Sequence, residues 1–411
     1  MSAERAFYAS RAKNDDADES EGEAPSEMSY QSADIDRETV ANDVTSPDQD
    51  AFEERLKQCF ENMSDKNAGI RVEALSEANV YLRQHYIPDI LSDWHLTFAD
   101  NLERSSRKGN CVEVDLALRL VALLVLQTST VDSEAVCRLT NTMKAMLTDG
   151  GQSMQLRARC ATSLGICAFG IIEEPDEIIS VVEALHSVWT HTKIGTSGAS
   201  EAKLFCAALS SWALLVTAFP KRSLEEAILT NVPKVCAFLG SPSVDIRICA
   251  GETLALLYEL AESMHSVRYE PPNDATTLAT LQRLSTESTK HIGKKDKRNQ
   301  RATFRDIHAA VKNGTFPDFK VKFGNEVLTI DSWTSKTHYD MFCCVLAGGM
   351  STHLKVNAII RDVFVLGPPV DPGQFRKIPK TERKAINEMA SRARRIERGK
   401  NRHDKRIAEL C

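Results

Sequence analysis

Between residues 50 and 291, hydrophobic positions recur with a helical period, in one predicted helix after another. A small alanine returns inside every second helix, at intervals of 43, 44, 46 and 43 residues. A second repeated position follows seven residues later, on the same helical face. Small residues at a fixed place let neighbouring helices approach closely. The alanines are Ala74, Ala117, Ala161, Ala207 and Ala250, and the second positions are Tyr81, Leu124, Ala168, Leu214 and Leu257.

Partner helices are expected between the alanine-bearing helices, over Ser133–Thr148, Pro175–His191 and Ser223–Leu239. Turn residues separate them, and Pro175 suits a first helical turn because its missing N–H has no partner there anyway. A two-helix unit of about 40–47 residues is typical of HEAT and armadillo repeats. The pattern therefore predicts five stacked units, an all-α superhelical solenoid over residues 50–291. The alternative is an ordinary all-α globule with accidental spacing.

A β-hairpin is predicted beyond the repeats. Apolar and polar residues alternate over Phe319–Phe323, and Glu326–Ile330 follows across the turn-forming Gly324-Asn325. Strict alternation on both sides of such a turn is the signature of two antiparallel strands. We expect the apolar side chains to face inward and Lys320 and Lys322 to face outward.

Short helices surround this hairpin. Ser332 is a good N-cap residue, and Gly348-Gly349 interrupts the helical pattern that follows it. The predicted helices are Ala302–Lys312, one from Ser332 to about Leu346, and a last one that ends near Phe364. Together with the hairpin they predict a small α+β C-terminal module.

The net charge of −6 conceals three unequal zones. Residues 1–54 hold 4 basic and 16 acidic residues, residues 290–322 hold 10 and 3, and residues 374–411 hold 13 and 5. A polar acidic segment buries too little apolar area to offset its ordering entropy. The predicted organisation is a disordered acidic tail (1–49), the repeats (50–291), a basic linker (292–301), the α+β module (302–370) and a basic, partly helical tail (371–411).

Two basic zones near one end favour a polyanionic partner, since Lys and Arg clusters release counterions from nucleic-acid phosphates. Tyr and Trp are absent from the tail, which favours contacts to the RNA backbone over base stacking. The alternatives are that charged tails only confer solubility, and that the linker is a nuclear localisation signal. The candidate RNA-binding residues are Lys294, Lys295, Lys297, Arg298, Arg301, Lys377, Lys380, Arg383, Lys384, Arg392, Arg394, Arg395, Arg398, Lys400, Arg402, Lys405 and Arg406.

Motifs of enzymes and metal sites are missing from the sequence. No glycine-rich phosphate loop, HExxH or CxxC motif is present, so we expect no catalysis, cofactor, metal or small-molecule substrate. His338 and His353 flank a predicted helix break, but no further ligand stands at metal-binding spacing. We expect Cys160 and Cys167 to pack in the core, like the adjacent Cys343-Cys344, and Trp333 to be buried.

Cysteine usage and hydropathy bear on the cellular compartment. Eleven cysteines behind an acidic, polar N-terminus indicate reduced thiols in an intracellular protein. The best apolar run, Leu116–Leu126, is interrupted by Arg119 and is shorter than the roughly 18–20 residues of a membrane span. We expect a cytoplasmic protein without a membrane partner, and also a nuclear one if the basic linker directs import.

Several local sequences are more specific than the repeat period. They are Ala51–Cys59, Asp65-Lys66, Phe304–Ile307, Ile330–Trp333 and Arg361–Pro368, followed by the basic tail. On these residues, the chain from about Ala51 onward resembles the interferon-related developmental regulator family. The resemblance implies an armadillo-like repeat domain, a conserved C-terminal module and no catalytic activity. It also implies transcriptional co-regulation with deacetylase-containing complexes and binding to translationally idle ribosomes.

The resemblance further implies that the C-terminal region reaches into the space that mRNA and tRNA would use, which would place Arg383 to Arg406 among ribosomal RNA. We therefore expect a non-enzymatic factor that binds inactive ribosomes, through rRNA and ribosomal proteins, and blocks the mRNA path. The alternative is a nuclear co-regulator whose solenoid grips partner peptides of transcriptional co-repressor complexes. The two differ in their partners, ribosomal proteins or chromatin regulators.

Overall fold

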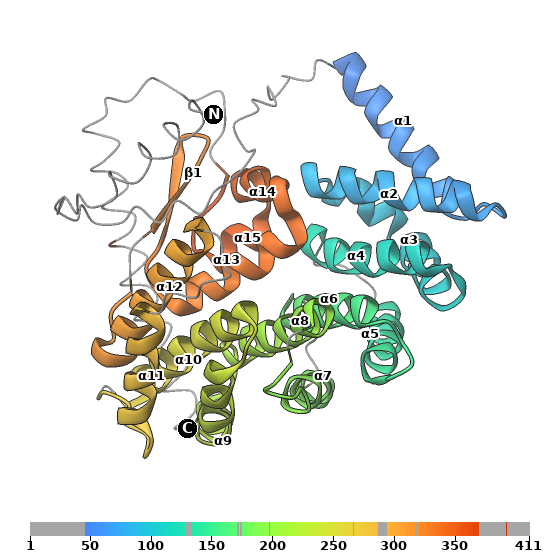
Figure 1. The fold of residues 1–411 in the computed structure, drawn as a ribbon. Helices are drawn as coiled ribbons and strands as arrows, with labels where there is room; N and C mark the ends of the chain where they lie inside the picture. Colours follow the sequence, from blue (N-terminus) through green and yellow to red (C-terminus); the bar gives the residue numbers. More distant parts are fainter. Residues whose placement is uncertain are drawn as a thin grey trace, which may run out of the picture.

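A computed structural model of the chain describes residues 46–369, apart from 129–132, 171, 173–174, 197, 266, 287–293 and 317–318, together with Arg392. Its helices stack in two rows into a curved solenoid (Figure 1). The inner row consists of α2 (Ala68–Gln84), α4 (Cys111–Gln127), α6 (Met154–Gly170), α8 (Ala199–Val216), α10 (Val244–His265) and α12 (Lys294–Asn313). The outer row consists of α1 (Ser46–Asn62), α3 (Pro88–Lys108), α5 (Ser133–Thr148), α7 (Pro175–Thr190), α9 (Lys221–Ala237) and α11 (Asp274–Thr286).

The repeated alanines mark the first five helices of the inner row, which confirms the predicted solenoid. The prediction of five units is wrong by one, because α11 and α12 add a sixth helix pair among the described residues. Each alanine lies in one of the helices α2, α4, α6, α8 and α10, and four of the five are fully buried, whereas Ala207 is partly buried. Glycines bring the same helices still closer. A Cβ atom added to Gly165 of α6 would lie 2.6 Å from Cβ of Ser211 in α8, and one on Gly251 of α10 would lie 2.9 Å from Cδ1 of Ile307 in α12.

Buried polar side chains also join successive inner helices. Ser163 Oγ donates to the Leu118 carbonyl oxygen at 2.7 Å, and Gln127 Nε2 donates to the Leu82 carbonyl oxygen at 2.7 Å. A buried polar group costs free energy unless it is hydrogen-bonded, so these bonds favour one register of the helices. Among the described residues, α8 alone has the length and hydropathy of a membrane span, and 61% of its apolar window is buried in the stack.

The C-terminal module begins with the predicted hairpin. Strands β1 (Phe319–Phe323) and β2 (Glu326–Ile330) pair antiparallel, with Phe319 opposite Ile330 and Phe323 opposite Glu326. Gly324 adopts a φ of 54° in the turn, in the left-handed region that glycine enters at little cost. The predicted hairpin is therefore confirmed.

Three helices complete the module: α13 (Trp333–Leu346), α14 (Met350–Val356) and α15 (Ala358–Val363). Ser332 caps α13 as predicted, since its hydroxyl accepts from Ser335 N at 3.1 Å. The predicted last helix to Phe364 is wrong in one respect, because it is two short helices. Asn357 divides them, because its side chain accepts from the N–H groups of Ile359 and Ile360 and so starts a new helix.

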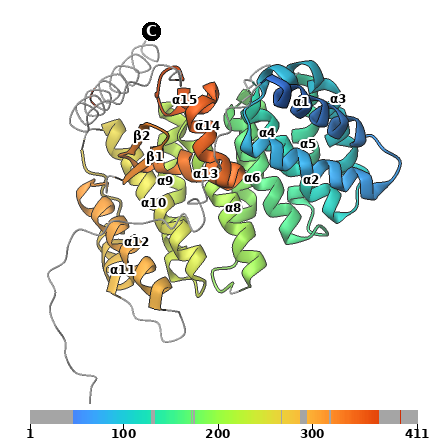
Figure 2. The same cartoon turned by 90° about the horizontal axis from the view of Figure 1, so that it is seen from above.

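The module packs on the concave face of the solenoid, where α13 contacts α2, α4, α8 and α10 (Figures 1 and 2). The carboxylate of Glu259 in α10 accepts from the backbone N–H groups of Trp333 and Thr334, at 2.7 and 3.0 Å. A carboxylate at a helix N-terminus satisfies free N–H groups and interacts favourably with the helix dipole. One turn further on, Lys336 Nζ lies 3.0 Å from the Glu252 carboxylate. These contacts fix α13 on α10.

A second group of contacts fixes α14 and α15 to the ends of α2 and α4. His353 Nε2 lies 3.2 and 3.1 Å from the carbonyl oxygens of Leu82 and Arg83, and Asn357 Nδ2 donates to the Leu126 carbonyl at 2.6 Å. The last carbonyls of a helix have no partner within it, so the module supplies their donors. Burial lowers the pKa of His353 to about 4, which keeps its ring neutral at pH 7.

Arg361 holds the module together internally. Its guanidinium is 1% exposed and pairs with the Glu326 carboxylate of β2 at 2.8 Å. The remaining donors reach backbone carbonyls, among them those of Leu354 and Gly367. A buried arginine is tolerated only when its charge is paired and its donors are satisfied. The Arg361 side chain therefore links the hairpin, α14 and the end of the module.

The predicted linker at residues 292–301 is wrong from Lys294 onward, because α12 begins there and runs to Asn313. Lys and Arg are good helix formers, so a dense run of them continues a helix as readily as it forms a connector. The predicted acidic tail lies outside the described residues up to residue 45, and α1 begins at Ser46, shortly before the predicted start of the repeats at residue 50.

A substitution at Gly349 tests the contact between the module and the end of α2. A Cβ atom at this position would lie 1.7 Å from the Arg83 carbonyl oxygen, whereas one on Gly348 would meet no atom within 4 Å. We expect Gly349→Ala to destabilise the protein by about 1–3 kcal/mol, the usual cost of overpacking. The adjacent Gly348→Ala is the control and should leave the free energy of unfolding nearly unchanged in urea titrations. Equal stability of the two variants would contradict this docking.

The histidines of the docked face predict an acid-sensitive interface. Burial lowers the pKa of both His338 and His353 from 6.5 to about 4, so only the unfolded chain takes up these protons as the pH falls from 6.5 to 4. The two histidines therefore do not lower the free energy of unfolding above pH 6.5. Below pH 6.5 this free energy falls by up to about 1.4 kcal/mol per pH unit for each proton.

Variants separate this effect from the general titration of carboxylates. We expect His353→Gln to flatten the fall of the melting temperature between pH 6.5 and 4.5, whereas His265→Gln, at an exposed position, should keep the wild-type slope. Identical slopes for all three proteins would show that His353 is not buried in its neutral form.

Candidate nucleic-acid interface

Helix α12 is both the last inner helix and the carrier of the first basic zone. Phe304, Ile307 and Val311 form its apolar stripe, are fully buried, and pack with α12 against α10 and α11. Arg305 and Lys312 are exposed on the same helix. The stripe anchors α12 in the solenoid, so these two cations are held on a rigid element.

The hairpin presents two further cations. Burial alternates along β1 as the sequence predicted, with Lys320 and Lys322 exposed and Phe323 buried. Lys355 of α14 is also exposed, and its Cε atom lies 3.2 Å from the Cβ position of Gly324 in the hairpin turn. Thus the module adds three lysines around one hairpin.

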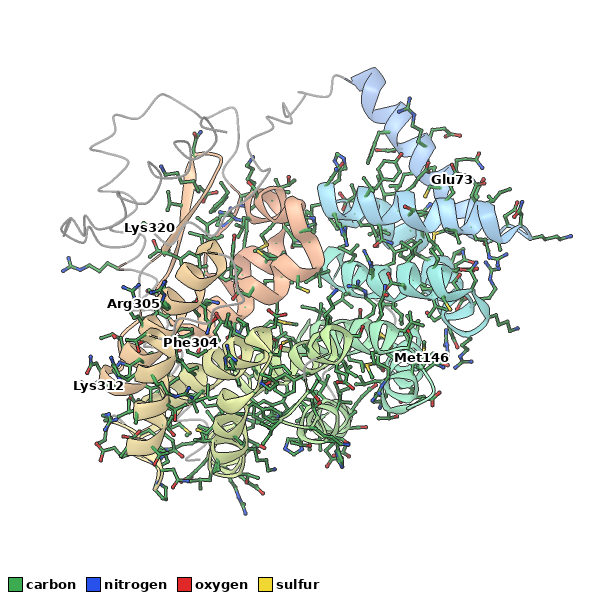
Figure 3. All side chains as sticks on the ribbon, viewed as in Figure 1. Glu73, Met146, Phe304, Arg305, Lys312 and Lys320 are labelled. Carbon is green, nitrogen blue, oxygen red and sulfur yellow. The ribbon has the colours of Figure 1, made fainter. Side chains whose placement is uncertain are left out.

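We call Arg305, Lys312, Lys320, Lys322 and Lys355 the basic edge. Figure 3 shows Arg305, Lys312 and Lys320 along one side of the molecule. Within the described part of the chain, none of the five forms an ion pair. Their charges are therefore available to an external anion.

Two ionisable residues of α12, Asp306 and His308, are neighbours of the basic edge. Burial raises the pKa of Asp306, against the opposing effect of Arg305. Burial, and secondly the charge of Lys312, lower the pKa of His308. Nearby Arg268 donates to the Lys312 carbonyl but is itself neutralised by Glu270 and Asp274, so it does not belong to the basic edge.

The predicted RNA-binding residues fall into two groups. Lys294, Lys295, Lys297 and Arg298 lie in the first turns of α12, and Arg301 is half-buried on the same helix. The predicted tail residues, from Lys377 to Arg406, lie outside the described residues except for Arg392, which is exposed and helical. The structure thus places the first group on one helix, α12, which also carries Arg305 and Lys312 of the basic edge.

Four members of the basic edge lie within residues 290–322, the basic zone that the charge count identifies. They are absent from the predicted RNA-binding residues, because within this zone those residues extend only from Lys294 to Arg301. Lys355 carries no such signal, because it stands apart from any basic run and reaches the hairpin only through the fold.

The residues singled out for metal or thiol chemistry are structural. His338 Nε2 lies 2.9 Å from Thr217 Oγ1, while His353 bonds to the end of α2, so the two rings serve separate contacts. Burial raises the pKa of Cys160 and of Cys167 to about 12, so both remain thiols in the core. The described residues contain no group of three or more metal ligands. Trp333 is 4% exposed, as expected for a core residue.

The prediction that both Cys343 and Cys344 pack in the core is wrong for Cys344. Cys343 is partly buried and packs against the core, but Cys344 is exposed. Adjacent positions on α13 point about 100° apart, so only one of them can face the packed side of the helix.

Two protein-family models match the sequence of this chain. The family model described as interferon-related developmental regulator matches residues 23–312, and the model of the interferon-related protein conserved region matches residues 357–407. The first match ends within one residue of the end of α12, and the second begins at Asn357, the residue that bonds to α4.

Two curated relatives cover most of the chain. Interferon-related developmental regulator 1 of Sus scrofa is 35% identical over 371 residues, or 87% of this chain and 82% of its own length. Interferon-related developmental regulator 2 of Mus musculus is 34% identical over 371 residues, with 87% and 83% covered. A designed armadillo repeat protein is similar in structure over 62% of this chain and 100% of its own, at 10% identity and a TM-score of 0.38. On the family models and the relatives, this chain belongs to the interferon-related developmental regulator family.

Proposed function

We propose that this protein is a non-enzymatic ribosome-binding factor whose basic edge lies against ribosomal RNA phosphates. The observation that carries the proposal is the basic edge itself, five exposed cations without an acidic partner among the described residues, on α12, β1 and α14. The 13 basic residues between 374 and 411 follow the module in sequence and extend the same charge. The family resemblance supplies the ribosome as the particle.

The chemistry of the basic edge favours contacts to the phosphate backbone. Lysine is a strongly hydrated point charge, and phosphates attract such charges independently of base sequence. Base recognition would require exposed aromatic rings on which bases stack. The large exposed hydrophobic side chains of the described residues are aliphatic, such as Leu229 and Val267. We therefore infer binding that follows RNA shape and charge, with strong dependence on salt.

The tail completes this proposal. A basic segment that orders on contact can enter an RNA-lined channel that a folded domain cannot. In our proposal Arg383 to Arg406 occupy the path of mRNA and tRNA, while the solenoid and the basic edge fix the point at which the tail enters. A factor of this kind would hold ribosomes in a translationally inactive state.

The nuclear scaffold remains the second candidate. A peptide-gripping solenoid would use its concave face, and α13 contacts α2, α4, α8 and α10 on that face. A partner peptide would have to displace the module or bind elsewhere. We therefore place the co-regulator role, with its deacetylase-containing partners, behind the ribosomal one.

Neutralising the basic edge should weaken ribosome binding and its response to salt. The test variant carries Arg305→Gln, Lys312→Gln, Lys320→Gln and Lys322→Gln. If all four cations contact phosphates, the slope of log K against log salt falls in magnitude by about three. Sedimentation with purified ribosomes between about 50 and 200 mM salt measures this slope.

A control variant removes the same number of exposed charges from the opposite end of the solenoid. It carries Arg55→Gln, Lys57→Gln, Lys66→Gln and Lys108→Gln, and it should bind with the wild-type slope. Deletion of residues 374–411 is a separate arm that should weaken binding further. Equal slopes for both variants and the wild-type protein would contradict the role of the basic edge, and the recovery of chromatin regulators without ribosomal proteins would favour the scaffold.

A further inference from the structure

Three arginines stand on successive inner helices beneath α13: Arg83 of α2, Arg119 of α4 and Arg159 of α6. A single carboxylate bridges two of them. Asp115 Oδ2 lies 2.8 Å from Arg119 Nη2, and Asp115 Oδ1 lies 3.0 Å from Arg159 Nε. Both guanidinium groups remain partly exposed, at 30% and 23% of their side-chain surface. They are therefore reachable from solvent.

Arg83 has no partner of this kind. Its Nε atom is buried without a hydrogen bond among the described residues, and so is Nε of Arg119. Burial lowers the pKa of Arg83, and the charges of Arg119 and Arg159 lower it further. Other arginines in similar positions are paired, as Arg71 is with Glu113 at 2.8 Å. A buried donor without a partner is costly, so the Nε atoms of Arg83 and Arg119 are two donors on adjacent helices that a bound anion would satisfy.

The end of α2 that carries Arg83 is fixed, although the Nε atom of Arg83 has no hydrogen-bond partner among the described residues. The Arg83 carbonyl oxygen accepts from His353 and is covered by Gly349, so docking of the module holds the end of α2 in place. The exposed Cys344 of α13 lies within the electrostatic reach of all three arginines. The arginines therefore line one end of the surface between α13 and the inner helices.

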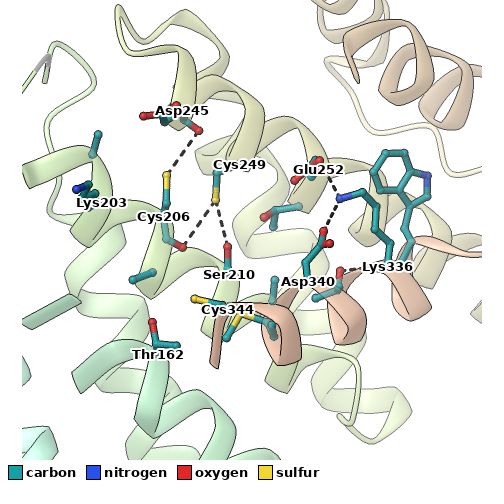
Figure 4. Close-up of a pocket in the computed structure, with 17 residues that line it drawn as sticks. Thr162, Lys203, Cys206, Ser210, Asp245, Cys249, Glu252, Lys336, Asp340 and Cys344 are labelled. Atoms are coloured by element: carbon teal, nitrogen blue, oxygen red, sulfur yellow. Dashed lines mark hydrogen bonds and ion pairs between the residues drawn. The ribbon is translucent and has the colours of Figure 1, made fainter. Parts of the chain in front are cut away.

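A groove of about 390 Å³ lies between α6, α8, α10 and α13. Cys344 links it to the arginines, because it lines the groove and lies within their electrostatic reach, although the arginines do not line the groove themselves. Figure 4 shows Thr162 and Cys344 at one side of the groove, and Lys336 between Glu252 and Asp340 at the other. Asp245 is a further carboxylate of the groove wall. These carboxylates disfavour a polyanionic strand in the groove but leave room for a small, singly phosphorylated molecule.

We propose that Arg83, Arg119 and Arg159 form a binding site for one phosphate group, either inorganic phosphate or a phosphate monoester whose organic part lies in the groove. Three guanidinium charges and one carboxylate leave a net charge of about +2, which a phosphate of about −1.5 to −2 matches. Guanidinium groups also suit phosphate geometry, because each can donate two parallel hydrogen bonds. This site is separate from the basic edge and does not depend on the proposed RNA binding.

The test measures binding of inorganic phosphate and of phenyl phosphate to the full-length protein by thermal unfolding at constant ionic strength, with chloride as the balancing anion. A ligand that binds the folded state raises the melting temperature as its concentration increases. We expect both ligands to do so, and Arg83→Gln to weaken each by about tenfold or more, the equivalent of one charge-assisted hydrogen bond. Tighter binding of phenyl phosphate would assign the groove to a monoester, and equal binding would assign the site to free phosphate.

Arg138→Gln is the matched control, because Arg138 of α5 is already paired with Glu103 at 2.9 Å. This variant should leave phosphate binding unchanged. Arg83→Lys keeps the charge and should retain part of the binding, so it replaces Arg83→Gln should that variant not fold. Absence of any phosphate-dependent stabilisation in the wild-type protein, or equal stabilisation in the wild-type protein and both Arg83 variants, would overturn the proposal.

Discussion

The concave face of this solenoid is closed by its own chain, through polar contacts at the ends of helices. Glu259 of α10 satisfies the first N–H groups of α13, while His353 and Asn357 supply donors to the last carbonyls of α2 and α4. Helix ends are the positions at which backbone groups lack partners, so these contacts replace water that the module excludes. The solenoid and the module therefore form one body rather than two domains on a linker.

Several functional features depend on this closure. It places Lys320 of the hairpin on the same side of the molecule as Arg305 and Lys312 of α12, and so assembles the basic edge from the solenoid and the module (Figure 3). It fixes the end of α2, where Nε of Arg83 has no hydrogen-bond partner in the part of the chain that the structure describes. It also occupies the face that a peptide-binding solenoid would offer to a partner. One docking event thus assembles the surface that we propose for RNA and reduces the room for a peptide groove.

Local features of the fold could be predicted from the sequence because their signals are local. The alanine spacing located the inner helices, the alternation around Gly324 located both strands, and Ser332 marked the start of α13. Docking left no such signal, because His353 and Leu82 are 271 positions apart, and Asn357 and Leu126 are 231 apart. The basic run at Lys294 does not distinguish a linker from a helix, because connectors and exposed helices share a high density of charge. The candidate site shows the same contrast. The basic zone can be counted along the sequence, but Lys355 lies far from that zone in sequence and comes close to the hairpin only in the folded structure.

Hydrogen–deuterium exchange of the full-length protein tests the closed concave face most directly. Exchange reports the free energy of local opening, segment by segment. If the module and the solenoid are one body, the amides of α13, with those of Trp333 and Thr334 at its start, will exchange as slowly as the core amides of α8 and α10. Exchange of α13 within seconds, while α8 and α10 stay protected, would show that the module is a mobile appendage and would contradict this account.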